Sequence, residues 1–515
     1  MARSPALAFA RLLTPGLALA VVLVTAWLLV DPRSPDLAAQ SYRETLFSRY
    51  GLTLWDDNWY AGHHLPGYSL LFGWVALALG MRVTGALAVL VSTWAFERVA
   101  TRVYGDPARW GAVCFALAAA GDVWIGRLTF ALGVSFALLA VLALVVCRRG
   151  WLAALLAAVC AATSPVAGLL LALAAGSYTI ATRRLVRSLV LPVLVVVLPL
   201  QALFPEGGWE PFALSSIAAN LAVVLAFLYA LPRSERMLRV GALVYLLAVL
   251  VCVVPAPMGS NIDRYAVLLA APLLVCALGR DGWRANGRPL VVTAAALAGI
   301  LIWTGWGAVR ESAGVAGDLS TSPAYYAPLE RFLNAHGGSL RRVEVPFTHS
   351  HWEAALLAPD YPLARGWERQ LDTRYDPLFF TGGTLSAGAY ARWLRNDAVS
   401  YVALPDVRLD GSSDQEAALI RRGQPFLREV LRSRHWRVFA VLGTQPLASP
   451  PARLIALGHD SFALRFARAG RSLVRLHYTR YWSAGAGARV QAAGEWTAVT
   501  SRRAGLVRVR TRFSL

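Results

Sequence analysis

Carboxylates, histidines and aromatic rings gather in a short stretch between residues 31 and 68. Asp36 comes first, the run Trp55-Asp56-Asp57-Asn58-Trp59-Tyr60 follows, and the pair His63-His64 closes the stretch. A carboxylate can accept the proton of an attacking hydroxyl group, as general base catalysis requires. Asp36, Asp56 and Asp57 are therefore candidates for the base of a group-transfer reaction. Each also has an ordinary alternative, because Asp56 and Asp57 can cap a helix or bind backbone amides and Asp36 can be a solvated loop acid.

Cationic or protonatable residues could hold a phosphate leaving group while charge develops on it. The candidates are Arg43, His63, His64, Arg127 and Arg264. A guanidinium group suits this role because it grips phosphate through two parallel hydrogen bonds. The alternatives are structural: Arg264 can pair with the neighbouring Asp263, Arg127 can belong to an exposed hairpin turn, and the histidines can be loop hydrogen-bond donors.

Aromatic residues among charged ones are typical of sugar-binding surfaces, where rings stack on sugar faces and charged groups bind hydroxyls. The candidates for acceptor or glycan binding are Trp55, Trp59, Tyr60, Trp352 and Trp367. Near Trp352, the residues His349, His351 and Glu353 alternate at strand spacing and could hold a divalent cation. Structural use is the favoured interpretation because no fuller metal signature is present, so no cofactor is certain.

The chain that carries these residues is too apolar to be a soluble globule. It has 515 residues, of which 57% are hydrophobic and 16% charged, with a mean hydropathy of +0.50. Many apolar stretches reach the length needed to cross a bilayer. The net charge of +20 would suggest nucleic acid for a soluble domain, but much of the arginine lies in short loops between spans, so no nucleic-acid partner is expected. The five cysteines lie in or beside apolar runs, which indicates no disulfide framework.

The arginines predict the topology, because positive loops stay in the cytoplasm. Arg3 and Arg11 precede the first span, residues 12–30, which lacks a cleavage site and is interpreted as an uncleaved anchor with a cytoplasmic N-terminus. Residues 31–81 then form an outer loop whose end, 66–80, is predicted as a juxtamembrane helix. The arginine clusters near 98–109, 148–149, 183–187, 233–239 and 280–288 alternate with outer turns and give about eleven spans. Because an odd number of spans starts from a cytoplasmic N-terminus, the residues after Arg310 are predicted on the outer side of the membrane.

Two domains follow from this topology: a transmembrane domain of residues 1–309 and an extracytoplasmic domain of residues 310–515. The second has no spanning run, and it is predicted as an α/β module followed by a β-rich module. Helices are expected at 324–335 and 388–395, and strands at 342–345 and 399–404. Alternating apolar and polar residues at 472–478 and 505–510 predict further strands. The fold class is therefore an α-helical polytopic membrane protein with a C-terminal extracytoplasmic α/β plus β-rich domain.

The order of features in the first outer loop resembles that of the GT-C glycosyltransferases, polytopic enzymes that use polyprenyl-phosphate sugar donors. The likeness lies in Asp36 soon after the first span, in the acids and histidines among aromatics, and in a Pro66-led helix before a span opened by Arg82. It covers roughly the first 150 residues, and more weakly the whole plan of spans and outer domain. The nearest families are the aminoarabinose lipid A transferases, the protein O-mannosyltransferases and the actinobacterial arabinosyltransferases, and a branch of actinobacterial membrane proteins is implied.

The resemblance also implies roles for individual residues. In these families the acid after the first span acts as base or orients the acceptor, which corresponds to Asp36. Many members have two adjacent acids there, whereas this chain has Asp36-Leu37, so either one acid suffices or Asp56 and Asp57 supply the second. Residues 257–265 resemble the outer entrance of a late span, where Arg264 would meet the lipid phosphate.

Three functions remain open at this point. The first is an inverting GT-C-type glycosyltransferase in the bacterial inner membrane, which would move a sugar from a polyprenyl-phosphate donor to an envelope glycan, lipid or protein on the outer face. The second is a transporter or flippase for a lipid-linked sugar, which the broken segment at Ser164-Pro165 favours. The third is a non-catalytic envelope assembly factor that binds glycan. The unusual polar residues lie at outer span ends rather than at mid-membrane depth, which favours the transferase.

Overall fold

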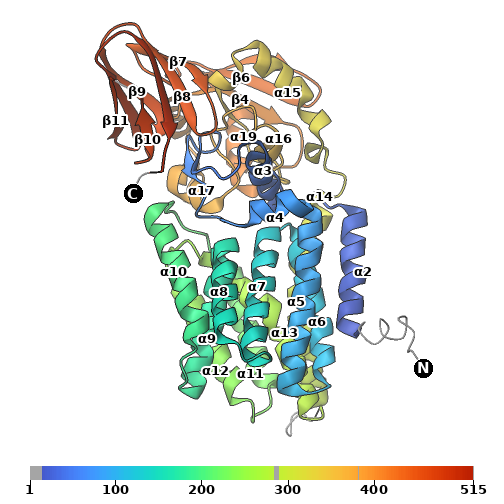
Figure 1. The fold of residues 1–515 in the computed structure, drawn as a ribbon. Coiled ribbons are helices and arrows are strands. Elements are labelled where there is room, and N and C mark those ends of the chain that lie inside the picture. The colour runs from blue at the N-terminus through green and yellow to red at the C-terminus, as the bar shows by residue number, and fades with distance from the viewer. Residues whose placement is uncertain (1–13, 284–288, 381, 486, 514–515) are drawn as a thin grey trace, which may run out of the picture. The chain divides into compact units, whose positions relative to one another are not determined.

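The structure is a computed structural model that describes residues 14–283, 289–380, 382–485 and 487–513 (Figure 1). Arg3, Arg11, Arg284 and Arg288, which contribute to the predicted topology, lie outside the described residues. The chain forms two compact units. The helical unit comprises Met1–Leu37, Gly67–Leu203 and Trp209–Ala313, and the mixed unit comprises Ala38–Pro66, Phe204–Gly208 and Gly314–Leu515.

The regions predicted as spans are helical in the described chain, although several of their helices are short. These helices are α2 (Pro15–Val30), α5 (Met81–Tyr104), α6 (Ala108–Ile125), α7 (Leu128–Val145), α8 (Gly150–Thr163), α9 (Pro165–Thr182), α10 (Arg187–Leu203), α11 (Leu214–Ala230), α12 (Arg236–Val251), α13 (Asp263–Arg280) and α14 (Leu290–Val315). The break at Ser164-Pro165 separates α8 from α9, because the Ser164 side chain caps α9 and Pro165 occupies its first turn. Figure 1 shows the helices running side by side along one direction.

The helical unit has the composition of a membrane domain. Six of the described helices are long and apolar enough to span a bilayer, and the bent pair formed by α2 and α3 (Pro35–Tyr50), with an angle of 75°, can count as a seventh. Large apolar side chains such as Leu29 and Val291 point outward and are 81% and 79% exposed, as lipid contact requires. The protein is therefore a multi-pass membrane protein. The count of eleven spans and their orientation stay predictions.

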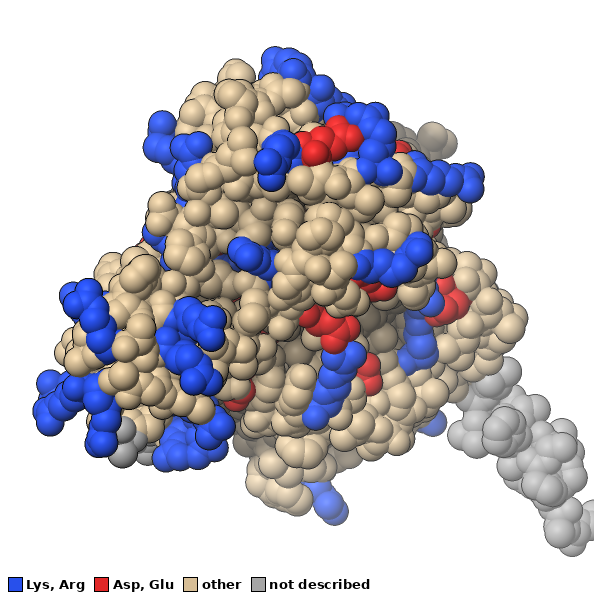
Figure 2. All heavy atoms as spheres, turned by 90° about the horizontal axis from the view of Figure 1, so that it is seen from above, with Lys and Arg blue, Asp and Glu red and all other residues tan. Residues whose placement is uncertain are grey.

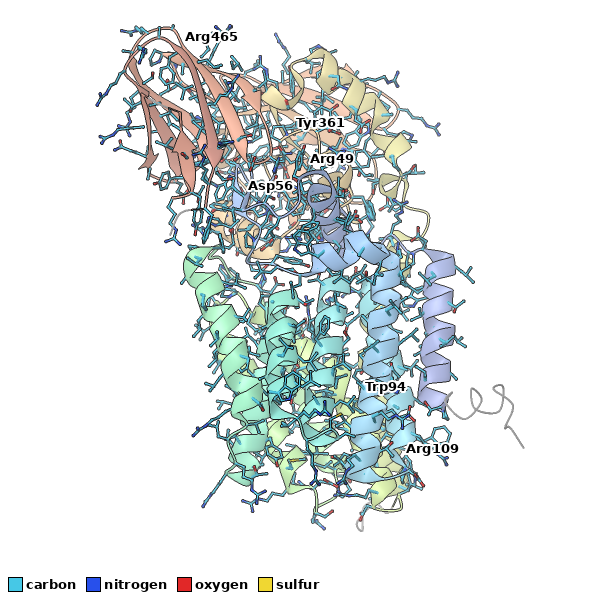
Figure 3. The ribbon with its side chains drawn as sticks, viewed as in Figure 1. Arg49, Asp56, Trp94, Arg109, Tyr361 and Arg465 are labelled. Carbon is cyan, nitrogen blue, oxygen red and sulfur yellow. The ribbon has the colours of Figure 1, made fainter. Side chains whose placement is uncertain are left out.

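The arginine-rich connections occupy one set of helix ends. Arg148 and Arg149 join α7 to α8, and Arg183 lies between α9 and α10. Figure 3 labels Arg109, in the first turn of α6, at this end of the bundle. The predicted juxtamembrane helix is shorter than expected: α4 runs only over Phe72–Leu79, because the Ser69 hydroxyl accepts the first backbone N–H and Gly80 ends the helix at a φ of 83°.

The first part of the mixed unit is an α/β module, as predicted. Its sheet has the order β3-β4-β6-β5, with a parallel β3–β4 pair and antiparallel neighbours beyond it. The elements are β3 (Arg342–Glu344), β4 (Val399–Pro405), β5 (Leu427–Arg432), β6 (Trp436–Val441), and the helices α15 (Pro323–Ala335), α16 (Glu353–Leu356), α17 (Arg369–Tyr375), α18 (Ala387–Asn396) and α19 (Asp414–Arg421). The expected helices near 324 and 388 and the expected strands near 342 and 399 are confirmed as α15, α18, β3 and β4.

The second part of the mixed unit is β-rich, which confirms the period-2 pattern of its sequence. Its two sheets have the orders β10-β13-β8-β7 and β11-β12-β9. The strands are β7 (Ala452–Leu457), β8 (Ser461–Phe466), β9 (Gly470–His477), β10 (Trp482–Ala484), β11 (Ala488–Ala493), β12 (Trp496–Ser501) and β13 (Gly505–Thr511). Apolar side chains such as Leu464, Val499 and Val509 form its buried core.

Much of the first outer loop belongs to the mixed unit rather than to the helical one. Its short strands β1 (Trp55–Asp56) and β2 (His63–His64) pair with each other. Backbone hydrogen bonds then join the loop to distant residues, from Leu363 N–H to Asn58 O at 2.8 Å and from His477 N–H to Ala61 O at 2.7 Å. The units therefore interleave along the sequence, whereas the predicted division at residues 309 and 310 treats the loop as part of the transmembrane domain.

Candidate active site

Asp36 and Arg127 meet in the helical unit. Asp36 lies in the first turn of α3, and Arg127 lies between α6 and α7. The Arg127 Nε group donates to Asp36 Oδ2 at 3.0 Å. Gly126 permits this approach: it has a φ of 101°, and a Cβ atom there would lie 2.3 Å from the Leu37 backbone nitrogen. The short turn between α6 and α7 thus fixes the position of Asp36.

A second acid shares Arg127. The Asp122 carboxylate, near the end of α6, is 4.0 Å from Arg127 Nη1 and is buried. Asp36 is more accessible, with 32% of its side chain exposed. The turn between α6 and α7 therefore places one guanidinium between a buried and a half-exposed carboxylate.

Arg264 completes the group, in the first turn of α13. Its guanidinium lies over the Phe130 ring, 5.0 Å from the ring centre, and donates to Asn261 Oδ1. It interacts electrostatically with Arg127, Asp36 and Asp122. Among the described residues, its buried Nε atom has no hydrogen-bond partner. Asp36, Asp122, Arg127 and Arg264 are called the charged cluster below.

The expected alternative partner of Arg264 is used elsewhere. Asp263 Oδ1 accepts a hydrogen bond from Asn220 Nδ2 at 2.8 Å, and Asn220 Oδ1 accepts from the Tyr245 hydroxyl. Within the described part of the chain, no ion pair joins Asp263 to Arg264. Asp263 and Arg264 thus have different hydrogen-bond partners, Asn220 and Asn261. The sequence prediction does not include Asn220 and Tyr245 as partners. Their polar side chains within apolar runs are the only sequence feature that could have indicated them.

Asp56 and Asp57 lie in the mixed unit and are fully buried. Asp56 accepts from the Tyr42 hydroxyl at 2.8 Å and from the Asn58 backbone at 3.2 Å. Asp57 accepts from the Trp55 indole at 2.8 Å. Burial raises the pKa of Asp56 to about 7, although the Tyr42 hydrogen bond opposes the rise. Burial also raises the pKa of Asp57 well above its usual range.

The predicted phosphate ligands divide between the units. Arg127 and Arg264 belong to the charged cluster, whereas Arg43, His63 and His64 lie in the mixed unit. Arg43 forms an ion pair with Glu368 and lies 5.3 Å from the Trp59 ring centre. His64 Nδ1 is 2.9 Å from Glu206. Glu206 and Glu368 are partners that sequence reasoning missed, although both stand among aromatics in the expected outer segments.

The two histidines are held in their neutral forms. Burial, with the Arg43 charge adding to it, keeps the pKa of His63 well below its ordinary value. Burial lowers the pKa of His64 to about 4. His63 Nδ1 lies 3.8 Å from Asp56 Oδ2, beyond hydrogen-bond distance. A neutral, buried imidazole offers little electrostatic attraction to a phosphate.

The aromatic candidates pack inside the mixed unit. Trp55, Trp59, Tyr60 and Trp352 are at most 4% exposed. Trp367 stacks on His351 with ring centres 3.5 Å apart. The rings of the first four are therefore covered by protein rather than open to a sugar, whereas Trp367 is half-buried.

The metal candidate is also held by protein contacts. Glu353 accepts hydrogen bonds from the Thr348 backbone at 3.3 Å and from the Thr348 hydroxyl. Across the residues that the structure describes, no group of three or more His, Cys, Asp or Glu side chains could hold a metal ion. His351 stacks on Trp367, so both His351 and Glu353 have contacts within the protein.

Comparison with known proteins gives limited likenesses. No protein-family model matches this chain, and no curated protein matches it. It is similar to the crystal structure of ArnT from Cupriavidus metallidurans in the apo state, with a TM-score of 0.47 and 15% identity over 86% of this chain and 100% of that one. For the same protein bound to undecaprenyl phosphate, the TM-score is 0.42 with 15% identity over 83% and 98% of the two chains. Likenesses of this size establish no family.

Proposed function

We propose that this protein is a membrane glycosyltransferase of the GT-C type. It would move a sugar from a polyprenyl-phosphate donor to an envelope glycan, lipid or protein on the outer face of the bacterial inner membrane, with inversion. One observation carries the proposal: a buried guanidinium nitrogen of Arg264 without a partner among the described residues lies in the same cluster as a half-exposed carboxylate, Asp36. A leaving phosphate and an attacking hydroxyl need these two groups together.

Each member of the charged cluster has a distinct role in this proposal. Arg264 binds the donor phosphate and stabilises the charge that develops on it as the sugar leaves. Asp36 accepts the proton of the acceptor hydroxyl as that oxygen attacks the anomeric carbon. Arg127 positions Asp36 through their 3.0 Å hydrogen bond. The Asp122 carboxylate lies 4.0 Å from Arg127 Nη1 and offsets part of the positive charge of Arg127.

Asp56 and Asp57 are assigned to the structure of the mixed unit in this proposal, not to the base. Both carboxylates are 0% exposed, and burial favours their protonated forms. A protonated carboxyl cannot accept the acceptor's proton. Arg43, His63 and His64 are likewise assigned to positioning within that unit, because Glu368 and Glu206 already bind Arg43 and His64.

The experiment uses the full chain reconstituted in proteoliposomes with labelled polyprenyl-phosphate sugars and an envelope extract as acceptor source. Conversion of the donor to polyprenyl phosphate is followed by thin-layer chromatography. The parent protein should release polyprenyl phosphate and label a component of the extract. Asp36→Asn should bind the donor and release almost none.

The competing functions predict different results in the same assay. A flippase would move the lipid-linked sugar across the bilayer and leave it intact in both proteins. An assembly factor would bind extract components without consuming any donor. Equal release of polyprenyl phosphate by the parent and by Asp36→Asn would remove Asp36 as the base.

A further inference from the structure

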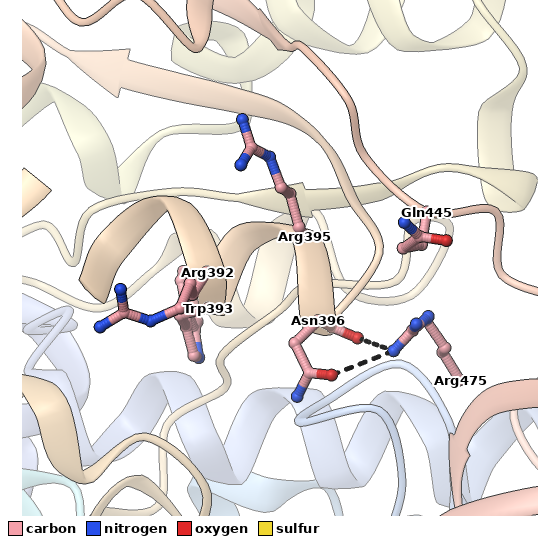
Figure 4. Close-up of a pocket in the computed structure, with 6 residues that line it drawn as sticks. All are labelled: Arg392, Trp393, Arg395, Asn396, Gln445 and Arg475. Carbon is pink, nitrogen blue, oxygen red and sulfur yellow. Dashed lines mark hydrogen bonds between the residues drawn. The ribbon is translucent and has the colours of Figure 1, made fainter. Parts of the chain in front are cut away.

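Arginine side chains line a hollow on the surface of the mixed unit. The residues of this hollow are far in the sequence from the first outer loop. The hollow has a volume of about 480 Å³, within the range of small-molecule sites. Figure 4 shows its lining residues, which are Arg392, Trp393, Arg395, Asn396, Gln445 and Arg475. The hollow therefore combines three guanidinium groups with two side-chain amides.

Secondary structure holds these groups in place. Arg392, Arg395 and Asn396 lie on the last turns of α18, and Arg475 lies on β9. Arg475 Nη1 donates to Asn396 Oδ1 at 3.1 Å, a contact drawn in Figure 4. Arg395 Nε donates to the Leu442 carbonyl oxygen at 3.3 Å. Arg475 Nη1 also donates to the Asn396 backbone oxygen, so one bond orients Arg395, two bonds orient Arg475, and the other N–H donors of both guanidiniums are left for a ligand.

No acid neutralises these arginines at close range. Within the described ranges, none of the three forms an ion pair, and Arg392 has no hydrogen bond either. The acid that acts on Arg475 is Asp397, and burial raises its pKa to about 7, although Arg342 and Arg475 oppose the rise. Asp397 therefore offsets the positive charge only partly at neutral pH.

The surrounding β-rich module has the same imbalance. Residues 446–515 contain twelve arginines and two acids. Arg453 and Arg465 even lie directly opposite each other on β7 and β8, an arrangement of like charges that destabilises a sheet. Figure 2 shows arginine side chains spread over the face in view, with fewer acidic ones. The positive-inside bias does not explain this surplus, because none of the module's described residues lies in a candidate membrane span.

We propose that the hollow between α18 and β9 binds an acidic sugar unit of an anionic glycan, one that carries carboxylate or phosphoryl groups. Figure 4 shows the guanidiniums of Arg392, Arg395 and Arg475 pointing in different directions, so they would bind separate anionic groups of the glycan through charge-assisted hydrogen bonds. Asn396 and Gln445 would bind sugar hydroxyls, because an amide both donates and accepts. This site is separate from the charged cluster and stands whether or not the chain transfers sugar.

The test measures binding to the full chain in nanodiscs of phosphatidylcholine, a lipid without net charge. The probes are oligogalacturonate, glucose 1-phosphate and a neutral maltooligosaccharide, followed by isothermal titration calorimetry. The parent should bind at least one acidic probe and bind the neutral one much more weakly. Arg392→Gln and Arg475→Gln should each raise the Kd about tenfold or more, as expected for a lost hydrogen bond to a charged group.

The matched controls are Arg453→Gln and Arg465→Gln, which remove the same charge from the sheet without touching the hollow. They should change the Kd by less than about threefold, the size of a screened surface charge effect. Arg392 has no contact to lose among the described residues, so Arg392→Gln should keep the unfolding temperature of the parent. Equal losses in pocket and control variants would show diffuse attraction and overturn the proposal, and so would a parent that binds no acidic probe.

Anionic lipid offers the same phosphoryl chemistry from another source. Vesicles of phosphatidylglycerol therefore serve as a further arm, in sedimentation with the detergent-solubilised full chain. Binding to these vesicles that Arg392→Gln weakens, together with no binding of either acidic sugar, would assign the hollow to a membrane surface and overturn the glycan proposal.

Discussion

Two sets of acids come from the same 31–68 stretch and have opposite surroundings. Asp36 lies in the helical unit, is 32% exposed and contacts one cation, Arg127. Asp56 and Asp57 lie in the mixed unit, are 0% exposed and accept hydrogen bonds from uncharged donors. The contrast shows that acids that stand among aromatic residues in the sequence can be fully buried. The plainer Asp36, with no aromatic neighbour in the sequence, has the better surroundings for a base.

The largest expected effect separates these acids directly. Asp36→Asn should lower the rate of sugar transfer by about 10²–10⁴-fold, the usual cost of losing a general base. Asp57→Asn should leave the rate within about threefold, because an asparagine carbonyl can still accept the 2.8 Å hydrogen bond from Trp55. The assay is initial rate in proteoliposomes, with both variants checked for parental unfolding temperature. The reverse ranking would exchange the roles of the two sites.

The next effect concerns Arg264, the residue of the charged cluster that is proposed to bind the donor phosphate. Arg264→Ala should weaken polyprenyl-phosphate binding by about 1.5–3 kcal/mol, the range of a hydrogen bond to a charged group. Arg264→Lys should fall between the parent and the alanine variant, because an ammonium group cannot form two parallel hydrogen bonds. Binding of a fluorescent polyprenyl phosphate to purified protein measures the difference.

Arg239→Ala provides the matched control for Arg264. It also removes an arginine from a helix of the same unit, where Arg239 donates to the Leu231 carbonyl oxygen at 2.8 Å. Its affinity for the lipid phosphate should equal that of the parent. Equal affinities for the parent and Arg264→Ala would place the donor site away from the charged cluster.

A third effect tests whether Asp56 is structural. Asp56→Ala leaves the buried Tyr42 hydroxyl and the Asn58 N–H without an acceptor, which should lower the free energy of unfolding by about 1–3 kcal/mol. Asp360→Ala is the control, because Asp360 is 65% exposed and its ion pair with Arg49 should contribute less than about 1 kcal/mol. Tryptophan fluorescence during unfolding measures both. Equal stabilities of the two variants would contradict the structural role.

The helices and strands could be predicted from the sequence because each depends on a local pattern. An apolar run of bilayer length gives a helix such as α7, and period-2 alternation gives a strand such as β13. Even the start of α9 follows from Ser164 and Pro165.

The candidate site was only partly predictable, because long-range contacts decide it. The contact of Asp36 with Arg127 joins residues from two separate helical segments, and the turn that brings them together depends on Gly126. Hydrogen bonds to residues such as Leu363 and His477 draw the 55–64 segment into the mixed unit. No local sequence pattern predicts such contacts. From the sequence, Asp36 and Asp56 are therefore both candidates for the base, and nothing in it decides between them.

The last effect is a pH dependence of stability that should belong to Asp56. Its pKa is raised by burial from an ordinary 3.8 to about 7, so between these values the folded state holds a proton that the unfolded chain releases. The stabilisation by this proton is complete below about pH 3.8 and is lost as the pH rises to about 7. His63 acts in the opposite direction, because its lowered pKa makes the folded state gain stability as the pH rises through the ordinary histidine range. The informative quantity is therefore the unfolding temperature of Asp56→Asn minus that of the parent, which should increase from pH 4 to pH 7. A constant difference would mean that Asp56 is ionised in the folded protein, and Asp56 would then rival Asp36 as the base.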